Sequence, residues 1–177
     1  KLREEYIKNM DRNIAYWFAV HTRSRHEKQV DSFLKEKSID SFLPLVKILS
    51  RRRDRREFVD IPLFPGYLFV NISLDNVYDV ICTRGVVRII GTEPFTPTPI
   101  SEKQVNDIKI LVNGNVKLDP YKYLKNGVRV RVKVGPLMGV EGILLKRKTN
   151  YRVVVSIDLL QKAASAEISI ADIEPID

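Results

Sequence analysis

Cysteine, histidine and long apolar runs are scarce in this chain of 177 residues. It contains one cysteine, Cys82, and two histidines. A single cysteine cannot close an internal disulfide, and no cysteine–histidine set has the spacing of a zinc site. The longest uncharged stretch, residues 61–74, is shorter than the roughly 20 apolar residues of a membrane span, and prolines and a glycine interrupt it. We therefore expect no disulfide, no metal site and no membrane span.

Catalytic motifs and a secretion signal are missing as well. The segment from Gly135 to Gly142 lacks the Lys-Ser or Lys-Thr ending of a phosphate-binding loop. The carboxylates are scattered among basic residues rather than paired between apolar strands. The first five residues carry no apolar signal core, so we expect a cytoplasmic protein. We also expect no catalytic residue, no cofactor and no enzymatic activity.

Positive charge, by contrast, is in surplus. Thirty Lys and Arg outnumber 22 Asp and Glu, which gives a formal net charge of +8 and a pI near 9.6. Such a surplus is typical of proteins with an anionic partner, either nucleic acid or an acidic membrane surface. The surplus is divided evenly between two parts of the chain. Residues 1–115 contain 19 basic and 15 acidic residues, and residues 116–177 contain 11 basic and 7 acidic residues. The shorter C-terminal part is therefore the more basic per residue.

Strand and helix patterns alternate in the first two thirds of the chain. Aromatic and branched residues predict a strand over 16–21, and Ser24 followed by Glu27 is typical of a capping box that begins a helix over 25–37. A second box, Ser101 with Gln104, precedes a helix that has one apolar face. Further elements are predicted as strands over 41–49, 58–61, 62–70 and 86–90, and as a short helix from 77 to about 85.

The pattern changes to a period of two beyond residues 113–120, which we interpret as a linker. Four valines from Val128 to Val134 alternate with three cationic residues, which predicts a strand with one apolar and one cationic face. Strands over 151–157 and 166–170 complete a small barrel of about five strands. We therefore predict an α+β fold class, with a flexible tail or short helix (1–14), an N-terminal α/β domain with an antiparallel sheet and flanking helices (15–112), a linker (113–120) and a C-terminal all-β, SH3-like barrel (121–177).

The best candidate for a nucleic-acid site is the basic turn after the first strand, which reads His21, Thr22, Arg23, Ser24, Arg25 and His26. It lies at a predicted helix N-terminus, where unpaired N–H groups and the helix dipole favour phosphate. Its arginine and histidine side chains add charge and flat faces that stack on exposed bases. A solvated turn, with the arginines paired to Glu27 or Asp31, is the alternative.

A second candidate is the arginine run at the tip of the predicted hairpin, which consists of Arg51, Arg52, Arg53, Arg55 and Arg56. Charge alone would let this run bind a nucleic-acid backbone, in a contact that weakens steeply with salt. A solvated hairpin tip explains the same run equally well. On the predicted strand 128–134, the cationic residues are better explained as the solvent-exposed face of the strand than as a row of phosphate-binding residues.

Apolar rings gather near these candidates, at Phe64, Tyr67 and Phe69. Rings that follow a turn belong either to the core or to a docking surface, and both interpretations stay open at this point. We expect Trp17 to anchor the core and Cys82 to be a small buried hydrophobic residue.

Several motifs, in this order, resemble the NusG family of transcription elongation factors. They are the aromatic strand with its capped helix (17–30), the segment Phe64–Val70, the tetrapeptide Thr83–Val86 and the glycine-bounded segment Gly135–Gly142. The resemblance covers residues 16–177. It implies an N-terminal NGN-type domain and a C-terminal KOW domain, which is a small β-barrel.

The resemblance also implies partners. The N-terminal domain would bind the clamp region of RNA polymerase through Phe64, Tyr67 and Phe69, and would suppress pausing. The KOW domain would bind a ribosomal protein or the termination factor Rho, although the segment 156–162 departs from the housekeeping pattern of that contact.

Within the family, the motifs 62–70 and 83–86 look more similar to the operon-specific LoaP and RfaH groups, LoaP first, than to housekeeping members. In those groups the basic turn contacts a nucleic-acid hairpin. Arg23 and Arg84 fall on matching positions, and Thr83 lies beside them.

We therefore expect a monomeric, operon-specific antitermination factor that binds RNA polymerase and a hairpin of nascent leader RNA, or of single-stranded DNA, and promotes read-through of terminators. Two alternatives stay open: a housekeeping elongation factor without sequence preference, and a KOW-type RNA- or ribosome-binding module without polymerase contact. The alternating valines favour a C-terminal domain that is β-structured from the start over a helical, fold-switching one.

Overall fold

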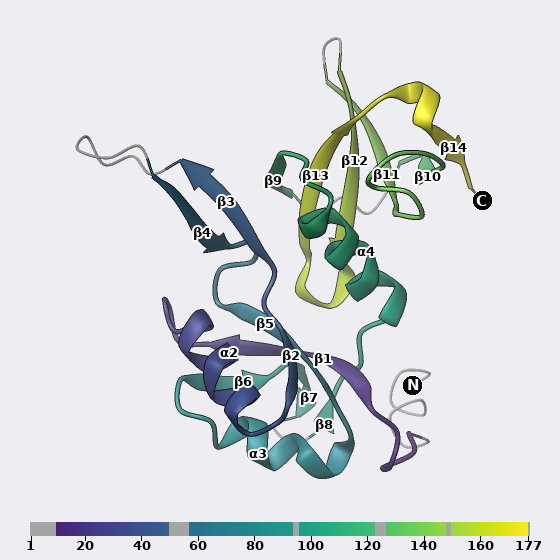
Figure 1. The fold of residues 1–177 in the computed structure, drawn as a ribbon. Helices are drawn as coiled ribbons and strands as arrows, with labels where there is room; N and C mark the ends of the chain where they lie inside the picture. Colours follow the sequence, from purple (N-terminus) through teal and green to yellow (C-terminus); the bar gives the residue numbers. More distant parts are fainter. Residues whose placement is uncertain (1–9, 50–56, 94–95, 123–126, 148–149, 177) are drawn as a thin grey trace. The chain divides into compact units, whose positions relative to one another are not determined.

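The chain divides into two compact units in a computed structural model, which describes residues 10–49, 57–93, 96–122, 127–147 and 150–176. One unit combines residues up to 43 with 64–102, and the other combines 44–63 with 103–177. Figure 1 labels the elements of both units, each of which contains its own antiparallel sheet.

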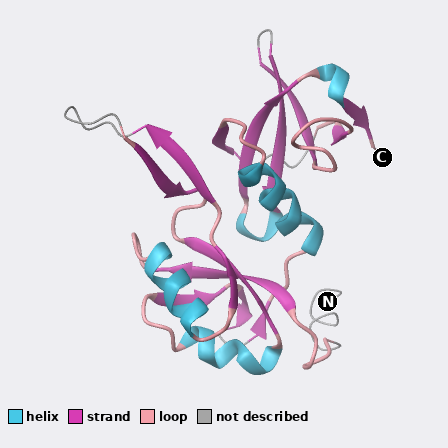
Figure 2. Ribbon diagram, viewed as in Figure 1, coloured by secondary structure: helices cyan, strands magenta, loops and turns pink. Residues whose placement is uncertain are grey.

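The N-terminal unit is built on a four-stranded sheet with helices beside it, as Figure 2 shows. Its elements are β1 (Tyr16–Thr22), α2 (Glu27–Glu36), β2 (Asp40–Phe42), β5 (Tyr67–Ile72), the 3₁₀ turn η1 (Leu74–Asn76), α3 (Val77–Ile81), β6 (Val86–Ile89), β7 (Gly91–Glu93) and β8 (Thr96–Pro97). The strand order is β2-β5-β1-β6, and β7 and β8 pair with each other. Helix α2 packs against β2 and β5, and α3 packs against β6. The α/β domain with an antiparallel sheet that the sequence predicts is therefore present.

The central strands β1 and β5 form the core of this unit. Residues 18–20 of β1 and 68–70 of β5 are completely buried, as continuous apolar runs at a sheet centre predict. Trp17 is also buried and forms a β-bridge with Ile100, so its predicted role as a core anchor is confirmed. Val30 of α2 is fully buried as well.

The single strand predicted over 41–49 is wrong, because the chain breaks it in two. β2 ends at Phe42, and β3 (Leu45–Leu49) begins only after Pro44, which has no N–H to donate to a strand ladder. The predicted hairpin is confirmed, since β3 pairs with β4 (Phe58–Pro62) from Leu45 opposite Pro62 to Leu49 opposite Phe58. Its arginine-rich tip, with Arg51, Arg52, Arg53, Arg55 and Arg56, lies outside the described residues.

The described residues from 102 onward form one α-helix, two 3₁₀ turns and a six-stranded antiparallel sheet. These elements are α4 (Glu102–Asn113), β9 (Leu118–Lys122), β10 (Arg129–Val132), β11 (Glu141–Arg147), β12 (Asn150–Ile157), η2 (Asp158–Leu160), β13 (Lys162–Ile168), η3 (Ile170–Asp172) and β14 (Ile173–Pro175). The strand order is β14-β10-β11-β12-β13-β9. Val105, Ile108 and Leu111 of α4 are completely buried, which confirms the apolar face predicted for this helix. The sheet has six strands rather than about five, and its closure into a barrel stays a prediction.

Strand β10 tests the alternating valine pattern. Val130 and Val132 are about 1% exposed and Arg129 and Arg131 are exposed, as the period of two predicts. The pattern fails at its ends, because Val128 and Val134 are 60% and 58% exposed. Both valines lie outside β10, whose ladder spans only four residues. A side chain beyond the end of a strand no longer has the neighbouring strands that would cover it.

Candidate nucleic-acid interface

The basic turn joins β1 to α2 and is fixed by two other loops. Its Thr22 N–H donates to the carbonyl oxygen of Gly66 at 2.9 Å, and its Arg23 N–H donates to that of Gly85 at 2.8 Å. Thr22 is buried, whereas Arg23, Ser24 and Arg25 are exposed. Three segments far apart in the sequence therefore meet here, and their backbones hold the two arginine side chains at the surface.

The capping box predicted for Ser24 and Glu27 is wrong. The N-cap of α2 is His26, which makes no side-chain capping bond, and the helix begins at Glu27 rather than at Arg25. The Glu27 side chain is buried, and its Oε1 accepts the Gly66 N–H at 2.7 Å. A backbone N–H that is shielded from water needs an acceptor, and this carboxylate accepts the part-buried Gly66 N–H instead of capping its own helix.

The arginines of this region have no acidic partner in the described part of the chain. No carboxylate among the described residues lies within ion-pair distance of Arg23, Arg25 or Arg84. Glu27 points inward to Gly66, and Asp31 forms an ion pair with Lys35 at 2.7 Å. The ion pairs that the sequence left open as an alternative are therefore not formed, and the nucleic-acid contact itself stays a prediction.

The backbone of the turn adopts a conformation that most residues avoid. Arg25 has a φ of 63°, in the left-handed region, although it is not a glycine. A non-glycine residue in this region is destabilised by about 1–2 kcal/mol, because its Cβ approaches the following carbonyl. The strain falls on an exposed residue of the candidate site, a place where proteins often store it.

Gly85 brings the loop that carries Arg84 close to the turn. Its φ is +97°, and a Cβ at this position would lie 2.8 Å from Cγ2 of Val30 on α2. Only glycine allows this approach. Arg84 is exposed beside the turn, whereas Thr83 is buried, where its hydroxyl donates to the Asp79 carbonyl at 2.8 Å and accepts from Lys37 Nζ at 2.9 Å. Thr83, like Thr22, therefore holds the loop rather than facing solvent.

His21 and His26 contribute differently to the candidate site. His26 is half-buried, and its Nδ1 lies 2.9 Å from the Ser24 carbonyl oxygen, a contact that stiffens the turn. His21 is half-buried at the end of β1, where its ring stacks on Tyr67 with centroids 5.1 Å apart. On the neighbouring strand β6, Arg88 is directly opposite His21 in the strand register. Sequence reasoning missed Arg88, although its place on the strand predicted over 86–90 was a usable signal.

The aromatic residues expected at a polymerase contact divide into buried and half-buried ones. Phe64 is 1% exposed and Phe69 is fully buried, and their rings meet edge to face with centroids 6.3 Å apart. Only Tyr67 of the three is partly exposed. Phe64 and Phe69 therefore belong to the core, which is the other interpretation that the sequence allowed. A polymerase contact through them stays a prediction.

Cys82 is exposed, so the prediction that it is buried is wrong. It is the C-cap residue of the five-residue helix α3, whose buried side is supplied by Val77 and Val80. A hydrogen bond between Tyr78 and Cys82 raises the pKa of the tyrosine above its usual value.

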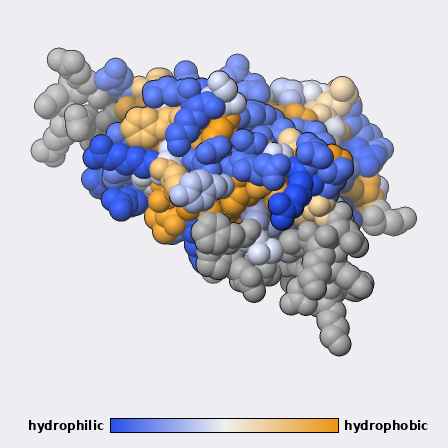
Figure 3. Space-filling view, turned by 90° about the horizontal axis from the view of Figure 1, so that it is seen from below, coloured by the Kyte–Doolittle hydropathy of each residue, from blue (hydrophilic) through white to orange (hydrophobic). Residues whose placement is uncertain are grey.

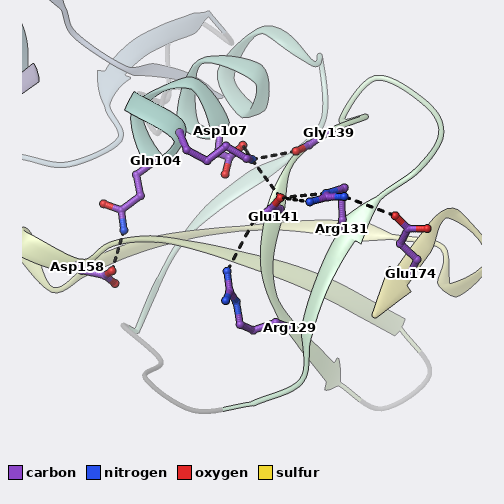
Figure 4. A network of polar contacts seen from close by, with 9 residues as sticks. Gln104, Asp107, Arg129, Arg131, Gly139, Glu141, Asp158 and Glu174 are labelled. Atoms are coloured by element: carbon purple, nitrogen blue, oxygen red, sulfur yellow. Dashed lines mark hydrogen bonds and ion pairs between the residues drawn. The ribbon is translucent and has the colours of Figure 1, made fainter. Parts of the chain in front are cut away.

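In the C-terminal unit the cations gather around one carboxylate, Glu141, as Figure 4 shows. Arg131 donates from Nε and Nη2 to Glu141 Oε1 at 2.9 and 2.7 Å. Arg129 and Lys103 lie 3.8 and 3.9 Å from the same carboxylate, and Glu174 is 3.9 Å from Arg131. The hydrogen bond from Arg131 holds the pKa of Glu141 below its usual value and raises the pKa of Arg131. The charges on β10 therefore form an ion network rather than an open cationic track.

The same network ties α4 to the loops of its sheet. Lys103 forms an ion pair with Asp107 one turn along the helix and donates to the Gly139 carbonyl oxygen at 3.0 Å. The side chain of Gln104 donates to Asp158 at 2.7 Å. Burial raises the pKa of Asp107, and the ion pair with Lys103 only partly opposes this shift.

Two further findings bound the search for sites. Within the described ranges, no group of histidine, cysteine, aspartate and glutamate side chains is arranged to hold a metal ion. Nor does any helix in those ranges combine the length and the apolar composition needed to cross a bilayer.

The face seen in Figure 3 is mostly hydrophilic, with apolar side chains showing between the polar ones.

The fold defines a class of two-unit proteins in which an α/β unit is followed by a unit built on a six-stranded antiparallel sheet. The model of the family described as "Transcription termination factor nusG" matches residues 15–109, more than half of the chain. The chain therefore belongs to the NusG family. The match includes much of α4, which lies in the compact unit of the C-terminal sheet, and the predicted boundary at 113–120 stays a prediction.

Individual relatives agree with this assignment. The transcription termination/antitermination protein NusG of Borreliella burgdorferi is 22% identical over 184 residues, which cover 90% of this chain and 98% of that protein. The protein of the same name from Thermus thermophilus is 29% identical over 71% of this chain and 79% of its own. A solved structure, "Domain interaction in Thermotoga maritima NusG", has the same fold with a TM-score of 0.55 at 17% identity, covering 92% of this chain and 98% of that one.

Proposed function

We propose that this NusG family protein is an operon-specific transcription antitermination and elongation factor of the LoaP type. Its N-terminal unit binds RNA polymerase, and its basic turn binds a nucleic-acid hairpin, in the first place the nascent leader RNA of the regulated operon. The bound factor then promotes read-through of terminators. This function is one of binding, and it assigns no reaction to the chain.

The observation that carries the proposal is the group of exposed arginines without carboxylate partners. Arg23, Arg25 and Arg84 are exposed, and no carboxylate among the described residues is close enough to pair with them. Guanidinium groups in this state can donate to phosphate oxygens without first breaking an ion pair. Unpaired bases of a hairpin loop provide the second ligand type, for which the nearby His21 and His26 rings are suited.

Two observations support a folded hairpin rather than an arbitrary strand. The turn is held by backbone hydrogen bonds to the Gly66 and Gly85 loops, so its arginines start from a fixed framework. Its left-handed residue, Arg25, fixes the direction in which the chain enters α2. A framework of this kind favours one ligand shape, because little ordering is left to be done on binding.

A housekeeping elongation factor without sequence preference is the second candidate. The curated relatives named above carry the general description of termination/antitermination proteins, which favours it. Such a factor would bind polymerase and show equal affinity for leader hairpins and scrambled RNA. A KOW-type RNA- or ribosome-binding module would instead fail to co-purify with polymerase.

A gel-shift series with leader hairpins and scrambled controls, repeated over a range of salt concentrations, tests the proposal. We expect one hairpin to bind more tightly than its scrambled form, and Arg23→Ala plus Arg25→Ala to abolish this preference. The matched control is Lys117→Ala plus Lys133→Ala, which removes two exposed positive charges from the C-terminal unit. Unchanged selective binding by the arginine variant would show that the basic turn is not the site.

Co-purification with RNA polymerase is measured on the same variants. We expect the arginine variant to retain polymerase, because the two contacts are proposed to be separate. Loss of both activities in a folded variant would contradict this separation. Trp17 is the only tryptophan and is buried in the N-terminal unit, so its fluorescence reports whether that unit is folded.

A further inference from the structure

We propose that Lys37 is a positioning residue for the nucleic-acid site, because its side chain fixes the loop that carries Arg84. This inference rests on the proposed function and specifies how one of its three arginines is held. Lys37 is the C-cap residue of α2, whereas the basic turn lies at the N-terminus of the same helix. It therefore acts on a ligand only through the loop.

The Lys37 ammonium group lies between two acceptors that belong to a different segment of the chain. Its Nζ donates to the Asp79 carbonyl oxygen at 3.0 Å and to the Thr83 hydroxyl oxygen at 2.9 Å. These partners are 42 and 46 residues further along the chain. The Thr83 hydroxyl in turn donates to the same Asp79 carbonyl at 2.8 Å. The three groups form a closed ring of hydrogen bonds between the ends of α2 and α3.

This ring satisfies polar groups that the end of α3 leaves open. The last carbonyls of a helix have no partner within the helix, and a nearby lysine side chain is a suitable donor. The Tyr78 and Val80 carbonyls already accept backbone N–H groups from the residues that follow α3. The Asp79 carbonyl between them receives the two side-chain donors instead. Thr83 is 3% exposed, so its hydroxyl also needs partners within the protein.

The segment held by the ring continues directly into the Arg84 loop. The Thr83 carbonyl oxygen accepts the Val86 N–H at 3.0 Å, which closes the turn around the exposed Arg84. The Gly85 carbonyl oxygen accepts the Arg23 N–H at 2.8 Å. Arg84 is therefore preceded by the residue that the lysine holds and followed by the residue that holds the basic turn.

Helix α2 is the support of this arrangement. A Cβ at Gly85 would lie 2.8 Å from Cγ2 of Val30 and 3.4 Å from Cβ of His26, so the loop follows the helix toward its N-terminus. Val30 is completely buried and cannot easily give way. The backbone N–H of Lys37 donates to two carbonyls of the last helical turn, at 3.2 and 3.1 Å. One end of α2 thus positions Arg84 relative to the turn at the other end.

A second lysine near the same helix end makes a different kind of contact. Lys35 forms an ion pair with Asp31, one turn back along α2, at 2.7 Å. Lys37 instead donates to uncharged acceptors of another element. Both lysines are exposed and carry the same charge. Lys35 is therefore the matched control for the loss of a positive charge at this position.

Hydrogen exchange and hairpin binding test the role of Lys37 in the full chain, with the leader hairpin selected in the gel-shift series. Lys37→Met removes the ammonium group and keeps the aliphatic stem, whereas Lys37→Arg restores a charged donor. We expect Lys37→Met to speed exchange of the Arg23 and Val86 amides and to weaken hairpin binding about 5-fold. Lys37→Arg should restore most of both properties. Lys35→Met should weaken binding less than about 2-fold, and equal losses in the two methionine variants would overturn the inference.

A double-mutant cycle with Arg84→Ala separates positioning from direct contact. Arg84→Ala alone should weaken hairpin binding about 10-fold, as loss of a hydrogen bond from a charged group does. In the Arg84→Ala background, Lys37→Met should cost less than about 2-fold, because no arginine is left to position. An equal cost in both backgrounds would show that Lys37 contacts the RNA itself, and the positioning role would be wrong.

The same variants distinguish failure of this inference from failure of the proposed function. If Arg84→Ala weakens selective binding and Lys37→Met does not, the positioning role is wrong and the proposed function stands. If neither variant changes hairpin binding, the proposed interface is wrong at Arg84 and the positioning role is overturned with it. Thr83→Val is a second test of the ring, because it removes the hydroxyl with little change of shape. Normal exchange of the Val86 amide in both Lys37→Met and Thr83→Val would overturn the inference, whatever the RNA result.

Discussion

The basic turn and strand β10 carry similar charges in different surroundings. Each presents two arginines separated by one residue, Arg23 with Arg25 and Arg129 with Arg131, and all four are exposed. On β10 the arginines lie within 4 Å of Glu141, at 3.8 Å from Arg129 and 2.7 Å from Arg131. At the turn, no carboxylate in the described part of the chain is that close.

The difference teaches that charge count does not identify a site. Residues 1–115 contain 19 basic and 15 acidic residues, and residues 116–177 contain 11 basic and 7 acidic residues. Each part therefore has a surplus of four positive charges. What distinguishes them is the direction of one glutamate. Glu141 faces its arginines, whereas Glu27 turns inward to the Gly66 N–H. An anionic ligand would have to displace Glu141 on β10, but it meets no such competitor at the turn.

Reversing the charge of the turn is expected to have the largest effect. Arg23→Glu plus Arg25→Glu should lower the affinity for the leader hairpin about 100-fold, since each unit charge close to a phosphate contributes about 1 kcal/mol or less in water. The same reversal of Lys117 and Lys133 should cost less than about 3-fold, through net charge alone. Fluorescence anisotropy measures both affinities. Equal losses in the two variants would mean that only net charge matters.

Removing a charge from the network should affect stability instead of binding. Arg131→Ala should lower the free energy of unfolding of the C-terminal unit only slightly, because it breaks a surface ion pair with two hydrogen bonds. Hydrogen exchange of the β10 and β11 amides measures this change. We expect hairpin affinity within about 2-fold of the unchanged protein, as for any cation that binds no phosphate. A large loss of affinity without loss of protection would make β10 part of the interface.

Acidification should weaken the network in a defined pH range. The pKa of Glu141 is lowered in the folded state, chiefly by its hydrogen bond from Arg131. The stabilisation that ionised Glu141 gives to the folded unit is therefore fully present at a pH above the usual pKa of 4.5. It is lost as the pH falls through the folded-state pKa. The effect of Asp107 on stability has the opposite sign, because burial raises the pKa of this carboxyl group. As the pH rises above the usual pKa of 3.8, ionisation of Asp107 therefore destabilises the unit.

Glu141→Gln isolates the first of these two contributions. The variant should be less stable than the unchanged protein near neutral pH, by less than about 1 kcal/mol for an exposed pair. The difference should vanish in acid, where Glu141 is protonated in both folded and unfolded states. Hydrogen exchange is too pH-dependent for this comparison, so urea unfolding followed by far-UV circular dichroism is the measurement. A difference that grows in acid would contradict the sign.

The smallest effect is expected at the strained residue of the turn. Arg25→Gly should stabilise the N-terminal unit by about 0.5 kcal/mol or less, because relief of the left-handed strain exceeds the extra freedom of glycine in the unfolded chain. Ser24→Gly is the matched control, since Ser24 has no positive φ and should only lose stability. Urea unfolding followed by Trp17 fluorescence compares them. A gain at Ser24→Gly and a loss at Arg25→Gly would reverse the expected order.

Local patterns predicted much of the fold. The hairpin of β3 and β4, the apolar face of α4 and the central strands of the first sheet follow from runs of similar residues, and the structure confirms them. Errors arose where a local signal had a distant competitor. The sequence offers Glu27 its own helix N-terminus, yet the carboxylate bonds to a residue 39 positions away. No spacing rule within a helix can reveal such a partner.

The candidate site was only partly predictable for the same reason. The turn from His21 to His26 stood out by composition, but the stacking of His21 on Tyr67 depends on the register of β1 against β5. Register is set by the whole sheet, so a sequence pattern that marks both strands still leaves their pairing open. Cys82 was misplaced because burial beside a five-residue helix depends on which side of the helix faces the sheet.

The slope of hairpin affinity against salt concentration tests most directly whether cations without carboxylate neighbours form the interface. Each phosphate contact contributes about 0.7–0.9 to the slope of log affinity against log salt. Arg23→Ala plus Arg25→Ala should therefore reduce the slope by about 1.5, and Arg129→Ala plus Arg131→Ala should leave it unchanged. Reduction by the second variant and not by the first would contradict the account.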